Sequence, residues 1–77
     1  MIKFTEHVET RLEERNITKE QIGEAIGSPD VVLPARANRS IAIKKFENNF
    51  LKVVFIKDQG DIIVITTHWI SKLKLKE

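Results

Sequence analysis

The sequence contains no cysteine and only two histidines, His7 and His68. It therefore has no disulfide bonds or thiolate metal ligands, and a structural zinc site is not expected. No apolar run approaches the roughly 20 residues of a membrane-spanning helix, and the N-terminal residues do not resemble a signal peptide. These absences predict a cytoplasmic protein, in a reducing compartment and without a membrane partner.

Familiar catalytic motifs are missing as well. The sequence has no glycine-rich phosphate loop, no HExxH motif and no paired carboxylates that could form a metal cage. Any catalysis is therefore expected to use His, Arg, Lys and hydroxyl groups, with no metal and no cofactor. Such groups suit RNA cleavage, because the 2′-hydroxyl is an internal nucleophile and the enzyme needs only to move protons and stabilise charge.

What the sequence does contain is typical of one folded domain. It has 77 residues, of which 42% are hydrophobic and 31% charged. Residues 1–33 carry four basic and seven acidic side chains, whereas residues 34–77 carry nine basic and four acidic ones. This asymmetry indicates a polyanionic partner such as RNA for the second half. Lysines that only solvate a sheet surface are the alternative.

Capping residues predict two helices in the first half. Thr5 can cap a first helix, with Phe4, Val8 and Leu12 as its buried stripe and an end near Asn16. Thr18 begins a second helix, because Gln21 stands at the capping-box position. We expect Gly27 to close that helix in a left-handed conformation before Pro29.

β-Branched runs predict a sheet in the second half. Asn48-Asn49 and Asp58-Gln59-Gly60 are expected to close hairpins, and Pro34 places the first run at a sheet edge. Residues 71–77 form either a short extra strand or a basic tail. The expected fold is α+β, with two N-terminal helices on one face of a three- to four-stranded antiparallel sheet. Its strands are expected at 31–33, 40–46, 50–56 and 61–69.

The two turns give a provisional register. They pair Ile43 with Val54, Ile63 with Ile56 and Thr67 with Lys52, so that one face is almost wholly aliphatic. We expect that face to lie under the helices, with Ile43, Val54 and Ile65 buried together. The opposite face is then open to a ligand, and its members are Ala42, Lys44, Phe46, Leu51, Val53, Phe55, Val64, Thr66 and His68.

Candidate site residues follow from the first helix and the last strand. His7, Arg11 and Arg15 are spaced by four residues, which places them on one side of a helix. An imidazole and guanidinium groups together can serve a phosphodiester site. The alternative is that the arginines pair with Glu14 or Glu9 and that His7 has no role beyond its helix turn.

A second group of candidates lies in the sheet. Thr66 and His68 share a strand face, which adds a hydroxyl and a second proton-transfer group, although His68 can equally be a half-buried histidine at a strand end. Arg39 and Lys44 are candidate phosphate- or RNA-binding cations. Trp69 is expected to pack against the core or the edge of the sheet.

Several short motifs resemble a family of small bacterial and archaeal domains that looks like a compact relative of the RelE/ParE-type toxins of toxin–antitoxin systems. They are Phe4-Thr-Glu-His7, Arg11-Leu-x-x-Arg15-Asn-Ile17, Ser28-Pro29-Asp30, Leu51-Lys-Val-Val-Phe55 and Ile63-Val-Ile-Thr-Thr67. The resemblance covers residues 4–69. It implies a helix pair followed by a curved antiparallel sheet and, for the RelE branch, ribonuclease activity that an antitoxin restrains. His7, Arg11, Arg15 and Thr66 match its polar positions.

The sequence thus leads to two functional hypotheses. The first is a metal-independent ribonuclease or toxin, in which Arg11 and Arg39 bind phosphate, His7 or His68 transfers protons and Thr66 orients a phosphate oxygen. The second is a non-catalytic module that binds a protein or nucleic acid through its open sheet face or an edge strand. The candidate partners are RNA, an antitoxin protein and a second copy paired through a sheet edge.

Overall fold

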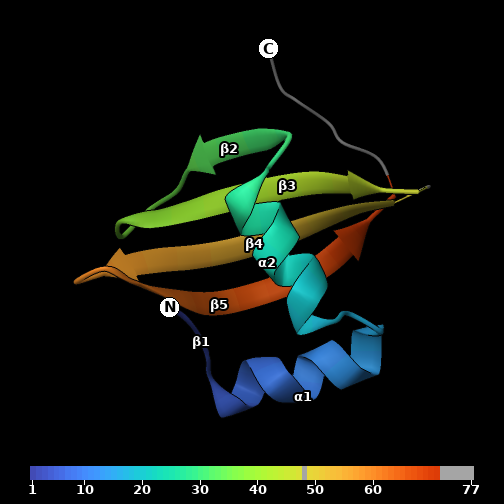
Figure 1. Ribbon diagram of the computed structural model, residues 1–77, viewed down its shortest axis with the longest axis horizontal. Coiled ribbons are helices and arrows are strands. Elements are labelled where there is room, and N and C mark those ends of the chain that lie inside the picture. Colours follow the sequence, from blue (N-terminus) through green and yellow to red (C-terminus); the bar gives the residue numbers. More distant parts are fainter. Residues whose placement is uncertain (48, 72–77) are drawn as a thin grey trace.

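The computed structural model describes residues 1–47 and 49–71. In these residues, two helices pack on a five-stranded sheet (Figure 1). The elements in chain order are β1 Ile2–Phe4, α1 Glu6–Arg15, α2 Lys19–Gly27, β2 Val31–Pro34, β3 Arg39–Phe46, β4 Asn49–Asp58 and β5 Asp61–Ile70. Residues 72–77, on which the predicted extra strand or basic tail mostly falls, lie outside the described part.

The capping residues set the helix boundaries as predicted. The Thr5 hydroxyl accepts a hydrogen bond from the Val8 backbone N–H, and Asn16 ends α1 with a φ of 56°. Thr18 and Gln21 form a complete capping box at the start of α2. Gly27 was expected to close α2 in a left-handed conformation, and this is wrong. Gly27 belongs to the helix and Ser28 caps it with a φ of −137°.

The sheet is mixed rather than antiparallel. Its strand order is β1-β5-β4-β3-β2, and β1 pairs with β5 in parallel. The four strands predicted from the sequence are present, and β2 lies at an edge as Pro34 indicated. The sequence did not reveal β1, because three residues are too few to show an alternating pattern. Whether an edge mediates association stays a prediction.

The hairpin registers differ from the predicted ones in two places. Phe46 pairs with Asn49, so Ile43 lies opposite Lys52 instead of Val54. The turn after Asp58 is as predicted, with Asp58 opposite Asp61. Beyond it, however, the register shifts between Val54 and Phe55, which is a β-bulge in the pairing of β4 with β5. The shift brings Lys52 opposite His68 rather than Thr67.

The helices cover the opposite face of the sheet from the one we predicted. In Figure 1, α2 crosses in front of the sheet and α1 lies beside β5. Val54 and Ile65 were predicted to be buried beneath the helices and are only half-buried, although Ile43 is buried. The buried cluster beneath the helices contains Val8, Leu12, Ile17, Ile22, Ala25, Ala42, Leu51, Val53, Phe55 and Val64.

Both faces of the sheet are apolar, and this explains the error. Alternation separates the two sets of side chains, but it does not determine which set receives the helices. We call the face opposite the helices the open face. Its central side chains are Val31, Leu33, Ile41, Ile43, Val54, Ile56 and Ile63. In the described part of the chain, no helix has the length and apolarity that a membrane crossing requires.

Candidate functional site

The end of α1 is fixed to the last strand by two hydrogen bonds. The Arg15 guanidinium donates to the carbonyl oxygen of Thr67 at 2.7 Å, and the Trp69 indole N–H donates to the carbonyl oxygen of Arg15 at 2.8 Å. Trp69 also packs edge-on against Phe46, which confirms its predicted packing role. These contacts hold the half-buried Arg15 side chain against β5 beyond Ile62–Val64, the part that pairs with β1.

The Arg15 guanidinium thereby lies at β5 near three polar side chains of the open face, Lys52, Thr66 and His68. We call these four residues the polar corner. Lys52 of β4 and His68 of β5 are direct cross-strand partners. The Cβ atoms of such a pair are about 5 Å apart. Thr66 lies two residues before His68 and therefore on the same face. The buried Thr67 hydroxyl donates to the Lys52 carbonyl oxygen at 3.0 Å, which ties the two strands together at this point.

The His68 imidazole is held in its neutral form. Burial lowers the pKa of His68 below the ordinary value of 6.5, and the positive charges of Lys52 and Arg15 lower it further. At neutral pH the polar corner therefore presents a proton acceptor between two cations. A neutral imidazole can accept a proton, and the two cations can attract an anion such as a phosphate group.

We expect an NMR titration to give His68 a pKa below 6.5, and Lys52→Met to raise it by removing one of the nearby charges. Lys57→Met is the matched control, because Lys57 is an exposed residue of the same strand that pairs with Ile62, far from His68. Protonation of His68 is disfavoured in the folded state, so the unfolded chain binds more protons as the pH falls through 6.5. The contribution of neutral His68 to the free energy of unfolding is therefore present above pH 6.5 and is lost as the pH falls below it. A His68 titration that Lys52→Met leaves unchanged would contradict this geometry.

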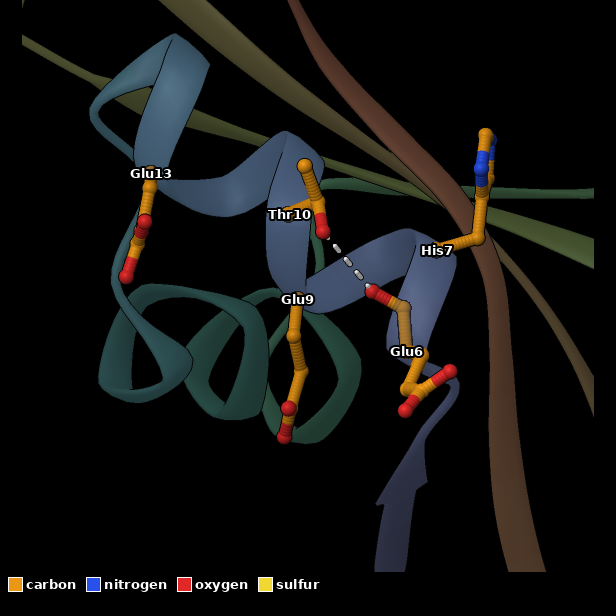
Figure 2. Close-up of a pocket in the computed structure, with 5 residues that line it drawn as sticks. All are labelled: Glu6, His7, Glu9, Thr10 and Glu13. Atoms are coloured by element: carbon orange, nitrogen blue, oxygen red, sulfur yellow. Dashed lines mark hydrogen bonds between the residues drawn. The ribbon is translucent and has the colours of Figure 1, made fainter.

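The structure separates His7 from the polar corner. His7 is exposed in the first turn of α1, and the shallow pocket that it lines is otherwise formed by Glu6, Glu9, Thr10 and Glu13. Figure 2 shows the His7 ring pointing away from the Glu9 and Glu13 side chains. The carboxylates give this surface a negative charge that disfavours a phosphodiester.

The other predicted cations are dispersed. Arg11 pairs with Glu14 at 2.9 Å in its own helix, as the alternative interpretation had it. Arg39 lies opposite Ile56, four residues along β4 from Lys52, or about 13 Å. Lys44 donates to the Ser28 carbonyl oxygen at 3.1 Å on the helix side of the sheet. Of the predicted site residues, the structure brings together Arg15, Thr66 and His68.

Sequence reasoning did not place Lys52 in the site. The bulge between β4 and β5 was the reason, because it changes the partner of Lys52 from Thr67 to His68. A usable signal was present nonetheless, since Lys52 is a cation between Leu51 and Val53 in an otherwise apolar strand. Residues 1–47 and 49–71 contain no group of three or more His, Cys, Asp or Glu side chains arranged to hold a metal ion.

Comparison with known proteins gives one match. The family model described as a domain of unknown function, DUF4258, matches residues 4–69. No curated protein and no solved structure matches the sequence. The matched range begins in β1 and ends in β5, and it includes every residue of the polar corner.

Proposed function

The chain belongs to the DUF4258 family of domains of unknown function, and we propose that its polar corner cleaves RNA without a metal ion. The observation that carries this proposal is a neutral imidazole, His68, between the cations Lys52 and Arg15. Thr66 supplies a hydroxyl on the same face. A general base, two charges for a phosphate and a hydrogen-bond donor are the groups that internal RNA cleavage requires.

In the proposed reaction, His68 accepts the proton of the 2′-hydroxyl as the 2′-oxygen attacks the adjacent phosphorus. The bond from the 2′-oxygen to phosphorus forms and the bond from phosphorus to the 5′-oxygen breaks. The leaving 5′-oxygen takes a proton from water, and the products end in a 2′,3′-cyclic phosphate and a 5′-hydroxyl. Lys52 and Arg15 stabilise the charge that builds on the phosphate oxygens, and the Thr66 hydroxyl orients one of them.

Two further considerations support this proposal. The basic second half of the sequence favours a polyanionic substrate. The resemblance to RelE/ParE-type toxins, although based on short motifs, implies the same reaction and extends the proposal to a growth-inhibiting toxin. The proposal differs from the sequence-based hypothesis in two respects. It assigns proton transfer to His68 and no role to His7, and it assigns phosphate binding to Lys52 and Arg15 in place of Arg11 and Arg39.

Incubation of the purified protein with a single-stranded RNA in EDTA tests this function. We expect cleavage that leaves 2′,3′-cyclic phosphate ends and that persists in the chelator, because the proposed reaction uses only side chains. The matched control is the same oligonucleotide with 2′-deoxyribose throughout, which lacks the nucleophile and is expected to stay intact. If the protein binds both oligonucleotides and cleaves neither, the ribonuclease proposal is wrong and a nucleic-acid-binding module is the better description.

A further inference from the structure

The open face has the composition of a protein interface. Branched aliphatic side chains from β2, β3, β4 and β5 form its centre, and both helices lie on the other side of the sheet. We call the set Val31, Leu33, Ile41, Ile43, Val54, Ile56 and Ile63 the aliphatic patch. Ile43 is buried and the other six are half-buried, so the accessible apolar surface comes from those six side chains. Apolar surface that several strands of a small domain share marks a site of association.

The charges around the patch are mainly positive. Lys3, Arg39, Lys45 and Lys52 occupy open-face positions of their strands, against two carboxylates, Asp58 and Asp61. A third carboxylate, that of Asp30, lies beside β3 and accepts a hydrogen bond from the Lys45 backbone N–H at 2.8 Å. Asp61 is already paired with Lys3 at 3.2 Å and with the N-terminal amine at 3.6 Å. The face therefore presents an apolar centre with unbalanced positive charge, and its complement is an apolar surface flanked by carboxylates.

A second copy of the chain does not match this face well. Two open faces in contact would place like charges together. The outer helix surface of a second copy is acidic, but the apolar side chains of the helices are turned to the core: Val8, Leu12 and Ile22 are buried, and Ile26 packs against the buried cluster. The open face of a second copy is therefore apolar but carries the same positive charge. Its helix surface carries the complementary negative charge but lacks apolar side chains for the patch.

RNA is also a poor match for the patch itself. Proteins that bind single strands on a sheet stack the bases on aromatic side chains. The patch is entirely aliphatic, and Phe50, the second residue of β4, is the aromatic residue on the open face of that strand. The proposed RNA site lies at the polar corner, which adjoins the patch where Ile43 and Val54 are the cross-strand partners of Lys52 and Thr66.

We propose that the open face binds an acidic amphipathic helix of a partner protein, with the apolar stripe of that helix on the aliphatic patch and its carboxylates near Arg39 and Lys45. A helix suits a sheet face, as α1 and α2 show on the other side of the same sheet. Recognition of this kind uses an apolar stripe for affinity and the flanking charges for selection. The interaction does not depend on catalysis at the polar corner.

Binding of two designed peptides to the full chain tests this proposal. Both are helices of about 18 residues, roughly 27 Å long, with the same leucine stripe, and the flanking positions are glutamate in one and lysine in the other. We expect the glutamate peptide to bind at least tenfold more tightly and to shift the amide resonances of the patch residues. Equal affinities would overturn the proposal, as would the absence of binding by the glutamate peptide.

Matched variants locate the binding site. Val54→Asp places a carboxylate in the patch and is expected to weaken binding of the glutamate peptide at least tenfold. Val32→Asp is the matched control, because Val32 is 55% exposed on the other side of β2, and it is expected to leave this affinity unchanged. The double variant Arg39→Glu and Lys45→Glu changes only exposed side chains and is expected to reverse the peptide preference without affecting the fold.

Three outcomes would contradict the assignment. An effect of Val32→Asp as large as that of Val54→Asp would show that the peptide binds elsewhere. A dimer in sedimentation equilibrium that Val54→Asp dissociates would assign the face to a second copy. If an RNA oligonucleotide shifts the amide resonances of the patch and the glutamate peptide does not, the open face would be assigned to nucleic acid.

Discussion

Val53→Ala is expected to lower the free energy of unfolding by about 2–3 kcal/mol, whereas Val54→Ala is expected to cost less than about 1 kcal/mol. The two valines are neighbours in β4 and lose the same atoms. Val53 is completely buried beneath the helices, so its truncation removes buried methyl groups and leaves a cavity. Val54 is half-buried on the open face, where water can fill the space.

Urea denaturation of the two variants and the parent measures this difference, with unchanged m-values as the check that the unfolding reaction is the same. The comparison tests which face of the sheet the helices cover, because the sequence-based register assigned the larger loss to Val54. A larger cost at Val54 than at Val53 would contradict the structure and restore that register.

His68→Ala is expected to reduce RNA cleavage by about 10²–10⁴-fold, because the proposed general base is lost. His7→Ala is the matched control and is expected to leave the rate within twofold, since His7 lies on an acidic helix surface outside the polar corner. Rates for a single RNA linkage should be measured for both variants, with circular dichroism to show that each is folded.

The pH dependence distinguishes catalysis from a structural role of His68. The parent rate is expected to fall as the pH drops through the lowered pKa of His68, because protonation removes the base. The His68→Ala protein is expected to lose this inflection, whereas the His7→Ala protein keeps it. A His68→Ala protein that retains the parent rate would eliminate the proposed mechanism, and an equal loss at His7 would favour the sequence-based site on α1.

The sequence predicts the elements whose causes are local. The helix boundaries depend on Thr5, Asn16, Thr18 and Gln21, each of which acts on backbone groups within a few residues. The turn between Asp58 and Asp61 was predicted from the local residues Asp58, Gln59 and Gly60. The structure confirms it, with positive φ values of 52° at Gln59 and 87° at Gly60. Arg15, Thr66 and His68 were identified by residue type, without knowledge of their neighbours.

The tertiary structure decided what depends on distant residues. The strand β1 forms by pairing with β5, about 60 residues later in the chain. Its three residues are too few to show the alternation of apolar and polar side chains by which a strand is predicted from the sequence. The bulge that joins Lys52 to His68 depends on how two strands fit together, and alternation within either strand is the same with or without it.

The sequence by itself therefore determined an α+β domain of two capped helices and four of the five strands, together with a pool of histidine, arginine and threonine side chains. Tertiary packing decided which apolar face the helices cover, and with it that Val53 is core, that Val54 belongs to a surface and that His68 lies between Lys52 and Arg15. The physical reason is that both faces of the sheet are apolar. Covering either face with the helices would therefore bury similar apolar side chains, and the sequence pattern does not distinguish the two. The helices contact the selected face through α1 on β5 and through α2 on β3 and β4.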